Sequence, residues 1–493
     1  MSVASPAYDA IVVGGGPAGA VAAWRLTGRG ARVLVLERTG YPREKVCGDY
    51  VEPRGLRILQ ALGCLEGIEA EGQLPITHSA TYVDGRRRYG GEIPFYGLSG
   101  TLPPHGYIVR RERLDHLLIQ AALRAGAELV EQAQVTGVEA SAEGVVVRAL
   151  RGGREHIHRA RAVVGADGVN SVVANAVGLL TADARHLAVS KRAYATGIDA
   201  DVGEAAFFFE ERLFPGYGWM FPMRGGVVNL GVGVLSEARD RLRLSVPALF
   251  DGFLEELRRS HPRCAGLELL APPIGGIVKT YGAAGPNHFA GGVLVGDAGC
   301  FVDPMTGEGI TPAMESALLA ADVLLEALAA GDCSAAALSA YERRFREYFD
   351  PAMLFVDLLA ALMRNRRLAK PWLKLMARGC EVAQADREFG RVAGGYFGGL
   401  DVRPSGILSQ IWLKMAQELL LLFPRGLAAP ARGGSAILRS LADLAEWQVA
   451  WTRSFVEEPV WAAGWLGDVQ RKWLRAFAAM TLWRADPRAA GLV

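Results

Sequence analysis

A glycine-rich turn near the start of the chain has the spacing of a site for nucleotide phosphates. Gly14, Gly16 and Gly19 follow the apolar run of residues 8–13 and open an Ala-rich segment at 17–28. The first glycine of such a turn permits a tight bend, the second lets the backbone approach a pyrophosphate, and the third lets helix and strand pack closely. Glu37 ends the next apolar run, where a carboxylate accepts hydrogen bonds from ribose hydroxyls. The pattern predicts a dinucleotide site that comprises Gly14, Gly16, Pro17, Ala18, Gly19, Glu37 and Arg38.

A second glycine turn, late in the chain, indicates which dinucleotide binds. Asp297 follows the apolar run at 292–295 and precedes the segment 304–310 and a long stretch rich in Ala and Leu. A carboxylate at this place can hold ribityl hydroxyls, and a helix that begins near Gly309 directs backbone donors and a positive dipole end toward flavin N1 and the C2 oxygen. The alternative is a turn that only caps a helix. We predict FAD, with further contacts from Gly296, Asp297, Pro304, Gly307, Gly309 and Ile310.

Three motifs in this order resemble those of the para-hydroxybenzoate-hydroxylase superfamily of FAD-dependent oxidoreductases. They are Arg111-Glu-Arg-Leu-Asp115, Gly165-Ala-Asp167-Gly-x-Asn-Ser171 and the Gly296-Asp297 turn. The resemblance implies that Arg111 contacts the cofactor beside its pyrophosphate or ribityl chain, and that Asp167 sits in a turn that serves both FAD and a reductant. For Arg111, a charge on the surface of a helix is the alternative.

Within that superfamily, two segments resemble the geranylgeranyl reductase family, and the resemblance extends over residues 8 to about 345. Residues 215–222 carry Tyr-x-Trp-x-Phe-Pro, and residues 45–48 carry Lys-x-Cys-Gly. Tyr217, Trp219 and Phe221 alternate, so on a strand all three point to one side and form an aromatic wall. Such a wall suits a long apolar substrate over the isoalloxazine ring, although packing in the core between sheets is the alternative.

The loop beyond Glu37 carries Cys47 and Gly48, and in this fold it returns toward the flavin ring. Gly48 would allow a close approach of the backbone to the cofactor. Cys47 would shape the cavity or supply a proton. The steric role is favoured, because a thiol with an ordinary pKa of about 8.5 is a mediocre acid.

These residues predict an enzyme, and the resemblance implies that reduced FAD passes hydride from N5 to one carbon of a C=C bond while an acid or water protonates the other. The substrate would be apolar and isoprenoid- or polyketide-like, and transiently bound NAD(P)H or another external donor would reduce the flavin. The alternative is a flavin-hydroperoxide monooxygenase, a hydroxylase or epoxidase of specialised natural-product metabolism. A flavin-dependent halogenase is less favoured, because the aromatic signature lacks Trp-x-Trp-x-Ile-Pro and no Lys lies between Lys45 and Lys191. A non-catalytic flavin-binding partner is the remaining class.

The elements that must position these residues alternate between strand and helix. Strand, helix and strand within thirty residues predict a parallel pair, while residues 189–235 alternate as strands joined by turns. We therefore predict an α/β fold with a Rossmann-like FAD-binding domain (1–75, 106–185 and 280–345). It is interleaved with a mostly antiparallel β-sheet substrate domain, an α+β insert (76–105 and 186–279). Residues 346–493 form a helical C-terminal segment, a cap or a contact with membrane or a second copy.

Composition excludes several other classes of protein. A formal net charge of +2 asks for no nucleic-acid partner. The 6 Cys include no CxxC pair and the 8 His form no cluster at metal spacing, so no metal is predicted and a reducing compartment is expected. The first residues carry no pattern of a secretory signal. We expect a cytoplasmic protein, or one held peripherally at the inner face of the membrane.

The C-terminal segment concentrates tryptophan and basic charge. Eight of the 10 Trp lie beyond residue 370, and residues 351–493 hold 19 Lys and Arg against 12 Asp and Glu. No apolar stretch reaches eighteen residues, so a spanning helix is not expected. Trp and basic residues on amphipathic helices are typical of a peripheral membrane contact. They are equally typical of helix packing, including a homodimer through these helices.

Overall fold

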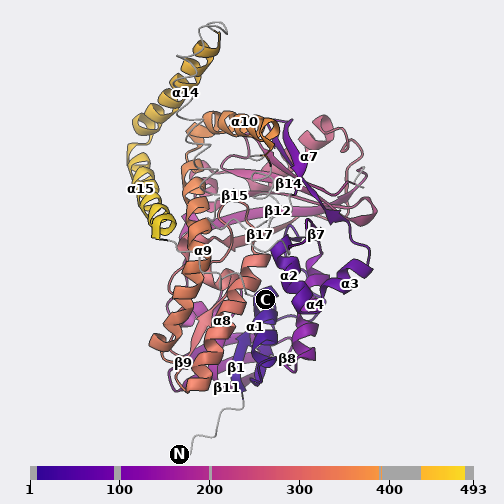
Figure 1. Cartoon of the computed structure of the whole chain (residues 1–493), viewed down its shortest axis with the longest axis vertical. Helices are drawn as coiled ribbons and strands as arrows, with labels where there is room; N and C mark the ends of the chain where they lie inside the picture. Colours follow the sequence, from indigo (N-terminus) through magenta and orange to yellow (C-terminus); the bar gives the residue numbers. More distant parts are fainter. Residues whose placement is uncertain (1–7, 94–101, 199–201, 388–389, 391–434, 483–493) are drawn as a thin grey trace, which may run out of the picture.

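The computed structural model describes residues 8–93, 102–198, 202–387, 390 and 435–482. Two large sheets lie one above the other in the view of Figure 1, and long helices run along their side. The lower sheet is built from the glycine-turn segments, and the upper sheet carries the aromatic signature. The site lies where the two meet.

The lower sheet has the strand order β18–β19–β11–β1–β2–β8, and β10 and β9 extend it along β11. β1, β2, β8, β11 and β19 run parallel, so the apolar runs predicted at 162–165 and 292–295 do join one sheet. Residues Ala10–Val13 and β2 are buried, as expected for a parallel sheet covered on both faces. The bounds are β1 Tyr8–Val13, β2 Val33–Leu36, β8 Glu128–Val130, β9 Gln134–Ser141, β10 Gly144–Arg151, β11 Arg154–Gly165, β18 His288–Phe289 and β19 Gly292–Leu294.

Three helices pack together beside this sheet. α1 (Pro17–Thr27) lies between α4 (Arg111–Arg124) and α8 (Ile310–Ala330). α1 begins at a proline, whose missing N–H costs nothing in the first turn, and its alanines allow close approach to neighbouring elements. α8 ends at Gly331, which has the left-handed φ of 72° that a helix terminus favours. α1 and α8 thus point their N-termini at the glycine turns.

The upper sheet has the order β16–β12–β15–β14–β13–β5–β6, with β17 also paired to β12. Its pairs are antiparallel except β13 with β5, which run parallel. The mostly antiparallel insert is therefore confirmed. The bounds are β5 His78–Val83, β6 Arg86–Glu92, β12 Leu187–Thr196, β13 Glu204–Phe209, β14 Gly216–Pro222, β15 Val228–Leu235, β16 Glu268–Leu269 and β17 Ile274–Lys279.

Helix α7 (Val246–Ser260) covers the outer face of the upper sheet, where it packs on β12 and β15 and buries Phe250, Phe253 and Leu254. The Phe253 ring also lies against Gly218 of β14. The opposite face of β14 therefore looks toward the lower sheet. A small sheet of β3, β7 and β4 joins the two halves. The remaining bounds are β3 Tyr50–Val51, β4 Pro75–Ile76, β7 Gly106–Ile108, α2 Pro53–Ala61, α3 Leu65–Ala70, α5 Val172–Ala176 and α6 Ser236–Leu242.

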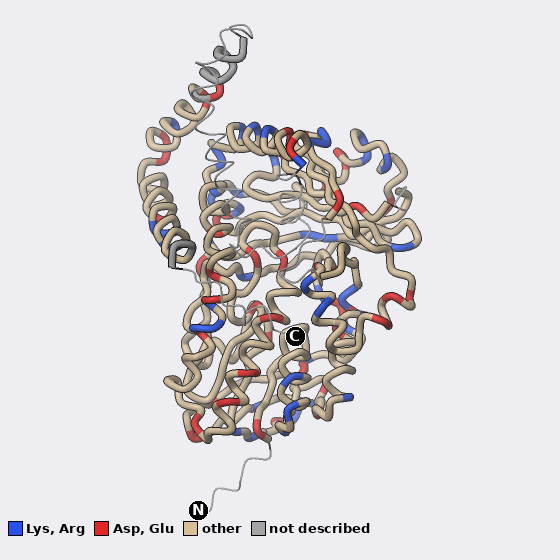
Figure 2. Tube along the Cα trace, viewed as in Figure 1, with Lys and Arg blue, Asp and Glu red and all other residues tan. Residues whose placement is uncertain are grey.

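The C-terminal part is helical, as predicted. It comprises α9 (Ala335–Met363), α10 (Ala369–Ala385), α14 (Ser435–Glu457) and α15 (Pro459–Leu482). α15 packs along α9, where the Lys472 ammonium lies 2.6 and 2.7 Å from the two Asp357 carboxylate oxygens and both side chains are buried. Figure 2 shows acidic positions among the basic ones on α14 and α15. Part of the basic excess therefore serves ion pairs that hold these helices in place.

The α/β architecture with its antiparallel insert and helical C-terminal segment confirms the predicted fold class. Among the described residues, no helix combines the length and the apolar character that crossing a bilayer requires.

Candidate active site

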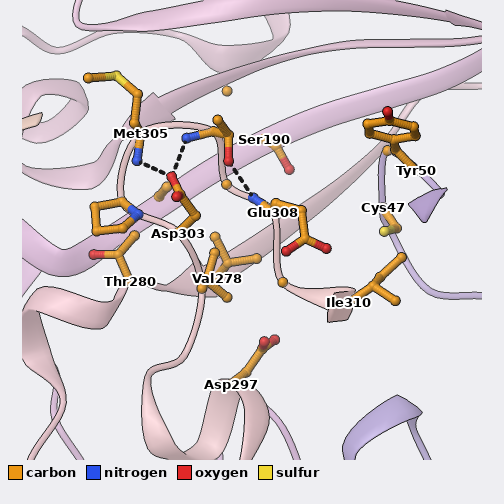
Figure 3. A pocket seen from close by; sticks show the side chains of 18 of the residues that line it. Cys47, Tyr50, Ser190, Val278, Thr280, Asp297, Asp303, Met305, Glu308 and Ile310 are labelled. Carbon is orange, nitrogen blue, oxygen red and sulfur yellow. Dashed lines mark hydrogen bonds between the residues drawn. The ribbon is translucent and has the colours of Figure 1, made fainter. Parts of the chain in front are cut away.

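A cavity of about 1720 Å³, including its opening to solvent, lies between the two sheets. Its walls come from segments far apart in the chain: the start of α1, the loop at 45–52, strand β14 and the turn at 295–310. Figure 3 shows residues of the 297–310 turn facing Cys47 and Tyr50 across it. The segments singled out in the sequence thus converge on one cavity.

The glycine turn at the end of β1 has the predicted geometry. Gly14 has a φ of 95°, and a Cβ there would lie 2.5 Å from the Ala166 carbonyl oxygen. A Cβ on Gly19 would lie 1.8 Å from the Gly14 carbonyl oxygen, so helix α1 packs against the turn at the distance that only glycine allows. Gly16 precedes α1 with no side-chain cap, which leaves first-turn N–H groups to a ligand. Pro17 and Ala18 line the cavity.

Glu37 is buried at the end of β2 with its carboxylate turned to the glycine turn. Its Oε2 accepts a hydrogen bond from the Gly15 N–H at 2.8 Å, and its Oε1 accepts from the Thr39 N–H at 3.0 Å. The carboxylate is thereby held beside the glycine turn, and its contact with ribose hydroxyls stays a prediction. Arg38 is exposed and does not line the cavity.

The second glycine turn forms the opposite wall. Gly296 and Gly307 have left-handed φ angles of 57° and 68°, and α8 begins after Gly309 without a cap from that residue. Asp297 lines the cavity, and its Oδ2 lies 3.2 Å from Lys45 Nζ. The other cofactor residues predicted in this turn also line the cavity, namely Gly296, Pro304, Gly307, Gly309 and Ile310.

Arg111 is buried, so the alternative of a surface charge is wrong. Its guanidinium forms two hydrogen bonds of 2.9 Å with Asp115, one helical turn on, and Arg43 contacts the same carboxylate at 2.8 Å. Arg111 also lines the cavity, where the cofactor could reach it. Its contact with the cofactor stays a prediction. Asp167 turns away: its carboxylate accepts from the Ser171 hydroxyl and from the Val172 N–H and caps α5, while its neighbours Ala166 and Gly168 line the cavity.

Tyr217, Trp219 and Phe221 all line the cavity from β14, with Phe207 and Phe209 beside them on β13. The Phe207 ring lies 6.1 Å from Tyr217 and 5.4 Å from Phe221, so the wall is also a packed cluster. The three side chains thus bound the cavity and are also packed laterally, because one face of a strand can do both, and their contact with a substrate stays a prediction.

The wall lies against two glycines that sequence reasoning missed, and the first of them leaves no room for a side chain. On β15, Gly231 pairs with Trp219 and Gly233 with Tyr217. A Cβ on Gly231 would lie 2.4 Å from Trp219 Cζ2, so the indole lies flat over that strand. The spacing of two residues between these glycines, inside an apolar strand, was the available signal.

A buried polar network ties the wall to the loop of Cys47. Asn229 donates to the Cys47 carbonyl and to Asp49 Oδ2, both at 2.9 Å, and accepts from Trp219 Nε1 at 2.9 Å. Tyr194 also donates to Asp49. Burial raises the pKa of Asp49 to about 6, against the opposing hydrogen bonds. Asn229, Asp49 and Tyr194 were not predicted.

Cys47 lines the cavity beside Gly48. Burial raises the pKa of the Cys47 thiol, which makes it a still weaker proton donor. A Cβ on Gly48 would lie 3.2 Å from Phe221 Cε2, so the loop touches the aromatic wall closely. The structure therefore favours a role in shaping the cavity for both residues.

A carboxyl cluster on the cavity wall was also missed. Glu52 and Glu308 line the cavity, and Glu315 lies behind them on α8. Arg54 donates to both Glu315 oxygens at 3.0 and 3.1 Å and lies 3.5 Å from Glu52. Burial, followed by the charges of Asp303 and Glu315, raises the pKa of Glu52 to about 7 despite Arg54. Glu52 and Glu308 lie 256 residues apart in the chain, so spacing could not pair them.

The residues present fit FAD. The turn at Gly14 leaves no room for side chains, the first turn of α1 has free backbone donors, and Glu37 is held beside them. This is the arrangement that binds the ADP half of a dinucleotide. The turn at 296–310 supplies a carboxylate and a second helix start within the same cavity as the aromatic wall. Gly296, Asp297 and Gly309 would hold the flavin half.

Comparison with known proteins agrees with this geometry. Residues 7–215 match the FAD binding domain model. A menaquinone reductase of Mycobacterium tuberculosis is 33% identical over 328 residues, which cover 64% of this chain and 76% of the relative. A digeranylgeranylglycerophospholipid reductase of Methanococcoides burtonii is 31% identical over 348 residues, which cover 69% of this chain and 80% of the relative.

Solved structures share the fold. A geranylgeranyl bacteriochlorophyll reductase-like protein from Thermoplasma acidophilum superposes with a TM-score of 0.63 at 23% identity, covering 76% of this chain and 91% of that one. A flavin-dependent halogenase gives the same TM-score of 0.63 at 22% identity, covering 77% and 72%. Such low identity speaks for the architecture alone. The two curated reductases, together with the FAD binding domain, show that this chain belongs to the geranylgeranyl reductase family of FAD-dependent oxidoreductases.

Proposed function

We propose that this FAD-dependent oxidoreductase saturates C=C bonds of an apolar, isoprenoid- or polyketide-like substrate. One observation carries the proposal: the aromatic wall of Tyr217, Trp219 and Phe221 and the turn at 296–310, which is predicted to hold the flavin, bound one cavity. An apolar chain lying on the wall would place its double bonds beside the cofactor. Both curated relatives cited above carry names of reductases, and one of these names an isoprenoid lipid.

The chain's own residues have three tasks in this reaction. The glycine turns and Glu37 would hold the cofactor, the aromatic side chains would orient the substrate, and the apolar wall of β13 and β14 would cover its apolar surface. Reduced FAD, when bound, supplies hydride to one alkene carbon. The other carbon needs a proton from a group on the cavity wall or from water.

Anaerobic single turnover tests this function. FAD-loaded protein is reduced with NADH, NADPH or dithionite, without oxygen, and mixed with menaquinone-4 or geranylgeranyl diphosphate as probes. The expected product has gained two hydrogen atoms per reduced bond and no oxygen, as seen by mass spectrometry. An oxygenated product that forms only after air is admitted assigns the monooxygenase instead. No turnover with any donor and probe leaves a flavin-binding partner.

We further propose that α15 makes a peripheral contact with an anionic lipid surface, from which such a substrate would be drawn. Trp473, Leu474 and Phe477 are 47%, 60% and 50% exposed on this helix, and the exposed Arg471 and Arg475 flank them. Exposed Trp and Phe beside arginines match an interfacial helix. The tryptophans of the tail thus fall into two groups. Trp473 is on the surface, whereas Trp465 is buried and donates to the Ala361 carbonyl oxygen at 2.8 Å. Trp412 and Trp483 lie outside the described residues.

Serine at positions 473, 474 and 477 together is expected to weaken binding to phosphatidylglycerol vesicles at least about tenfold, because apolar area and an aromatic anchor are lost. Vesicle co-sedimentation measures this. Ile157→Ser with Leu270→Ser removes exposed apolar side chains elsewhere and should leave binding unchanged. Equal binding of both variants contradicts the lipid contact. Conversion of a dimer to a monomer in light scattering, without a change in vesicle binding, assigns this face to a homodimer.

A further inference from the structure

Glu308 lies in the tight turn that precedes α8, between Gly307 and Gly309, which are predicted to contact the flavin. Figure 3 shows its carboxyl group directed into the cavity, on the side where Cys47 and Tyr50 lie. It belongs to the same cavity wall as the aromatic residues, since Tyr217 donates to the carbonyl oxygen of Thr306 in this turn. The carboxyl group therefore borders the space that a substrate on the wall would occupy.

The two oxygens of Glu308 have different surroundings. Oε1 accepts a hydrogen bond from the Thr311 N–H at 2.8 Å, which fixes the side chain against the first turn of α8. Oε2 is buried and has no hydrogen-bond partner among the described residues. A buried polar atom without a partner is uncommon in a folded protein and is expected where a ligand or a proton completes the site.

The charges around Glu308 favour its neutral form. Burial, followed by the negative charge of Glu52, raises the pKa of Glu308 well above its usual range; Arg54 and the Thr311 N–H oppose this, and Glu315 adds to it. The Arg54 guanidinium is hydrogen-bonded to Glu315 and close to Glu52, so its charge is shared. The other titratable groups that interact with Glu308 are the phenols of Tyr50 and Tyr217. Buried like charges of this kind retain a proton at neutral pH.

Other proton donors on the cavity wall are less suited. The Cys47 thiol and the Tyr217 phenol have pKa values raised by burial, and the Tyr217 hydroxyl is already donating to Thr306. Asp49 also lines the cavity, and its Oδ1 has no hydrogen-bond partner among the described residues. However, Asp49 is fully buried, Tyr194 and Asn229 donate to its Oδ2, and its pKa is raised only to about 6, so it is largely ionised at neutral pH. Lys45 is paired with Asp297. Glu308 combines an oxygen without a partner, a carboxyl group directed into the cavity and surroundings that favour its neutral form.

We propose that Glu308 is the general acid that protonates the substrate alkene, an assignment that rests on the proposed function. One alkene carbon receives hydride from the reduced cofactor, and the π electron pair forms a C–H bond between the other carbon and the proton on Glu308 Oε2. The O–H bond breaks, its electron pair stays on the carboxylate, and solvent returns the proton before the next turnover. The cofactor loses the two electrons that the alkene gains, so the step balances.

Glu308→Gln tests the assignment, because glutamine keeps an oxygen for the Thr311 N–H and cannot donate an acidic proton. With the probe that the wild type reduces, the rate of the anaerobic oxidative half-reaction should fall about 100- to 10,000-fold, the usual contribution of a general acid. Reduction by dithionite and FAD content should stay unchanged. Glu308→Asp, which keeps an acid on a shorter stem, should retain part of the rate. Glu326→Gln, at an exposed ion pair on α8, is the matched control.

The pH dependence supplies a second signature. Since the acid form is the active one, wild-type rate should be present at low pH and fall as pH rises through the raised pKa of Glu308. Glu308→Gln should lack this descending limb. In the folded wild type the pKa of Glu308 lies above that of a glutamate in the unfolded chain. The stability that Glu308 contributes is therefore lost as the pH rises through that raised pKa. In thermal unfolding of the holoenzyme from about pH 5 to about pH 9, the melting temperature of Glu308→Gln should therefore rise relative to that of the wild type as the pH increases.

Each outcome decides one assignment. If the wild type reduces the C=C bond of the probe, and Glu308→Gln does so at the same rate and with the same pH dependence, Glu308 is not the general acid and the proposed function stands. Absence of saturation by the wild type refutes the proposed function. In that case the unfolding series still shows whether Glu308 holds a proton, and no difference in pH dependence between the two proteins overturns that part as well.

Discussion

Replacing Gly16 by valine will give a folded protein that does not retain FAD. The backbone at Gly16 has φ −71° and ψ −172°, which any residue adopts, and an added Cβ meets only Arg43 Nη2, at 3.0 Å. That side chain can move, so the fold should tolerate the change. The new side chain fills the space through which the pyrophosphate reaches the backbone. Losing one or two hydrogen bonds to charged phosphate, at about 1.5–3 kcal/mol each, should weaken FAD binding by about 10- to 10,000-fold.

Purified Gly16→Val should be colourless and should have the circular dichroism of the wild-type apoprotein, and fluorescence titration with FAD measures the affinity. Gly285→Ala is the matched control, because a Cβ there meets nothing within 4 Å and lies outside the cavity wall. It should be yellow. Wild-type affinity in Gly16→Val would mean that the pyrophosphate lies elsewhere than at this turn.

Asn229→Leu will lower the free energy of unfolding by about 3–5 kcal/mol, although the two side chains are similar in size. The change leaves two buried groups without a partner, the Trp219 N–H and the Cys47 carbonyl, and removes one of the two donors to Asp49 Oδ2. A buried polar group that loses its partner costs about 1–3 kcal/mol, and some of this is recovered by local relaxation. Because the same bonds hold Trp219 and the Cys47 loop against each other, turnover should fall as well.

Denaturant unfolding of the apoprotein measures the loss of stability. Asn175→Leu, at an exposed position of α5, should change stability by less than about 0.5 kcal/mol. FAD affinity should change little in Asn229→Leu, since Asn229 belongs to the wall and not to the glycine turn. Equal stability of the two variants would show that the network around Asp49 does not hold the cavity wall.

The cofactor turns could be predicted because their physical requirements are local. A tight turn, a helix start and a close helix–strand contact each need glycine at one position, and these positions fall within six residues from Gly14 to Gly19. The aromatic wall was equally visible, since the alternation of a strand places Tyr217, Trp219 and Phe221 on one side wherever the strand lies. The order of the motifs then indicated the family, and the curated relatives confirmed it.

Contacts between distant segments could not be predicted in this way. Asn229 stands in an apolar strand with no motif around it, and its partners Cys47 and Asp49 lie about 180 residues earlier. Glu308 was visible in the sequence only as part of a turn. Its raised pKa comes from burial and from the charge of Glu52, which lies 256 residues earlier in the chain. Arg111 and Asp115 stand one helical turn apart in any helix, but only the packing around them decides that they are buried.

The tryptophans of the tail show the same division. An amphipathic helix that packs on a protein and one that lies on a membrane have the same periodicity, so the sequence left both open. Packing against α9 decided that Trp465 is internal, whereas Trp473 remains on the surface. Local backbone geometry and side-chain alternation are properties of short segments, and they follow from sequence. Burial, and with it the pKa values and hydrogen-bond partners that set the chemistry, belongs to the assembled fold, because it depends on which distant segments exclude water from each other.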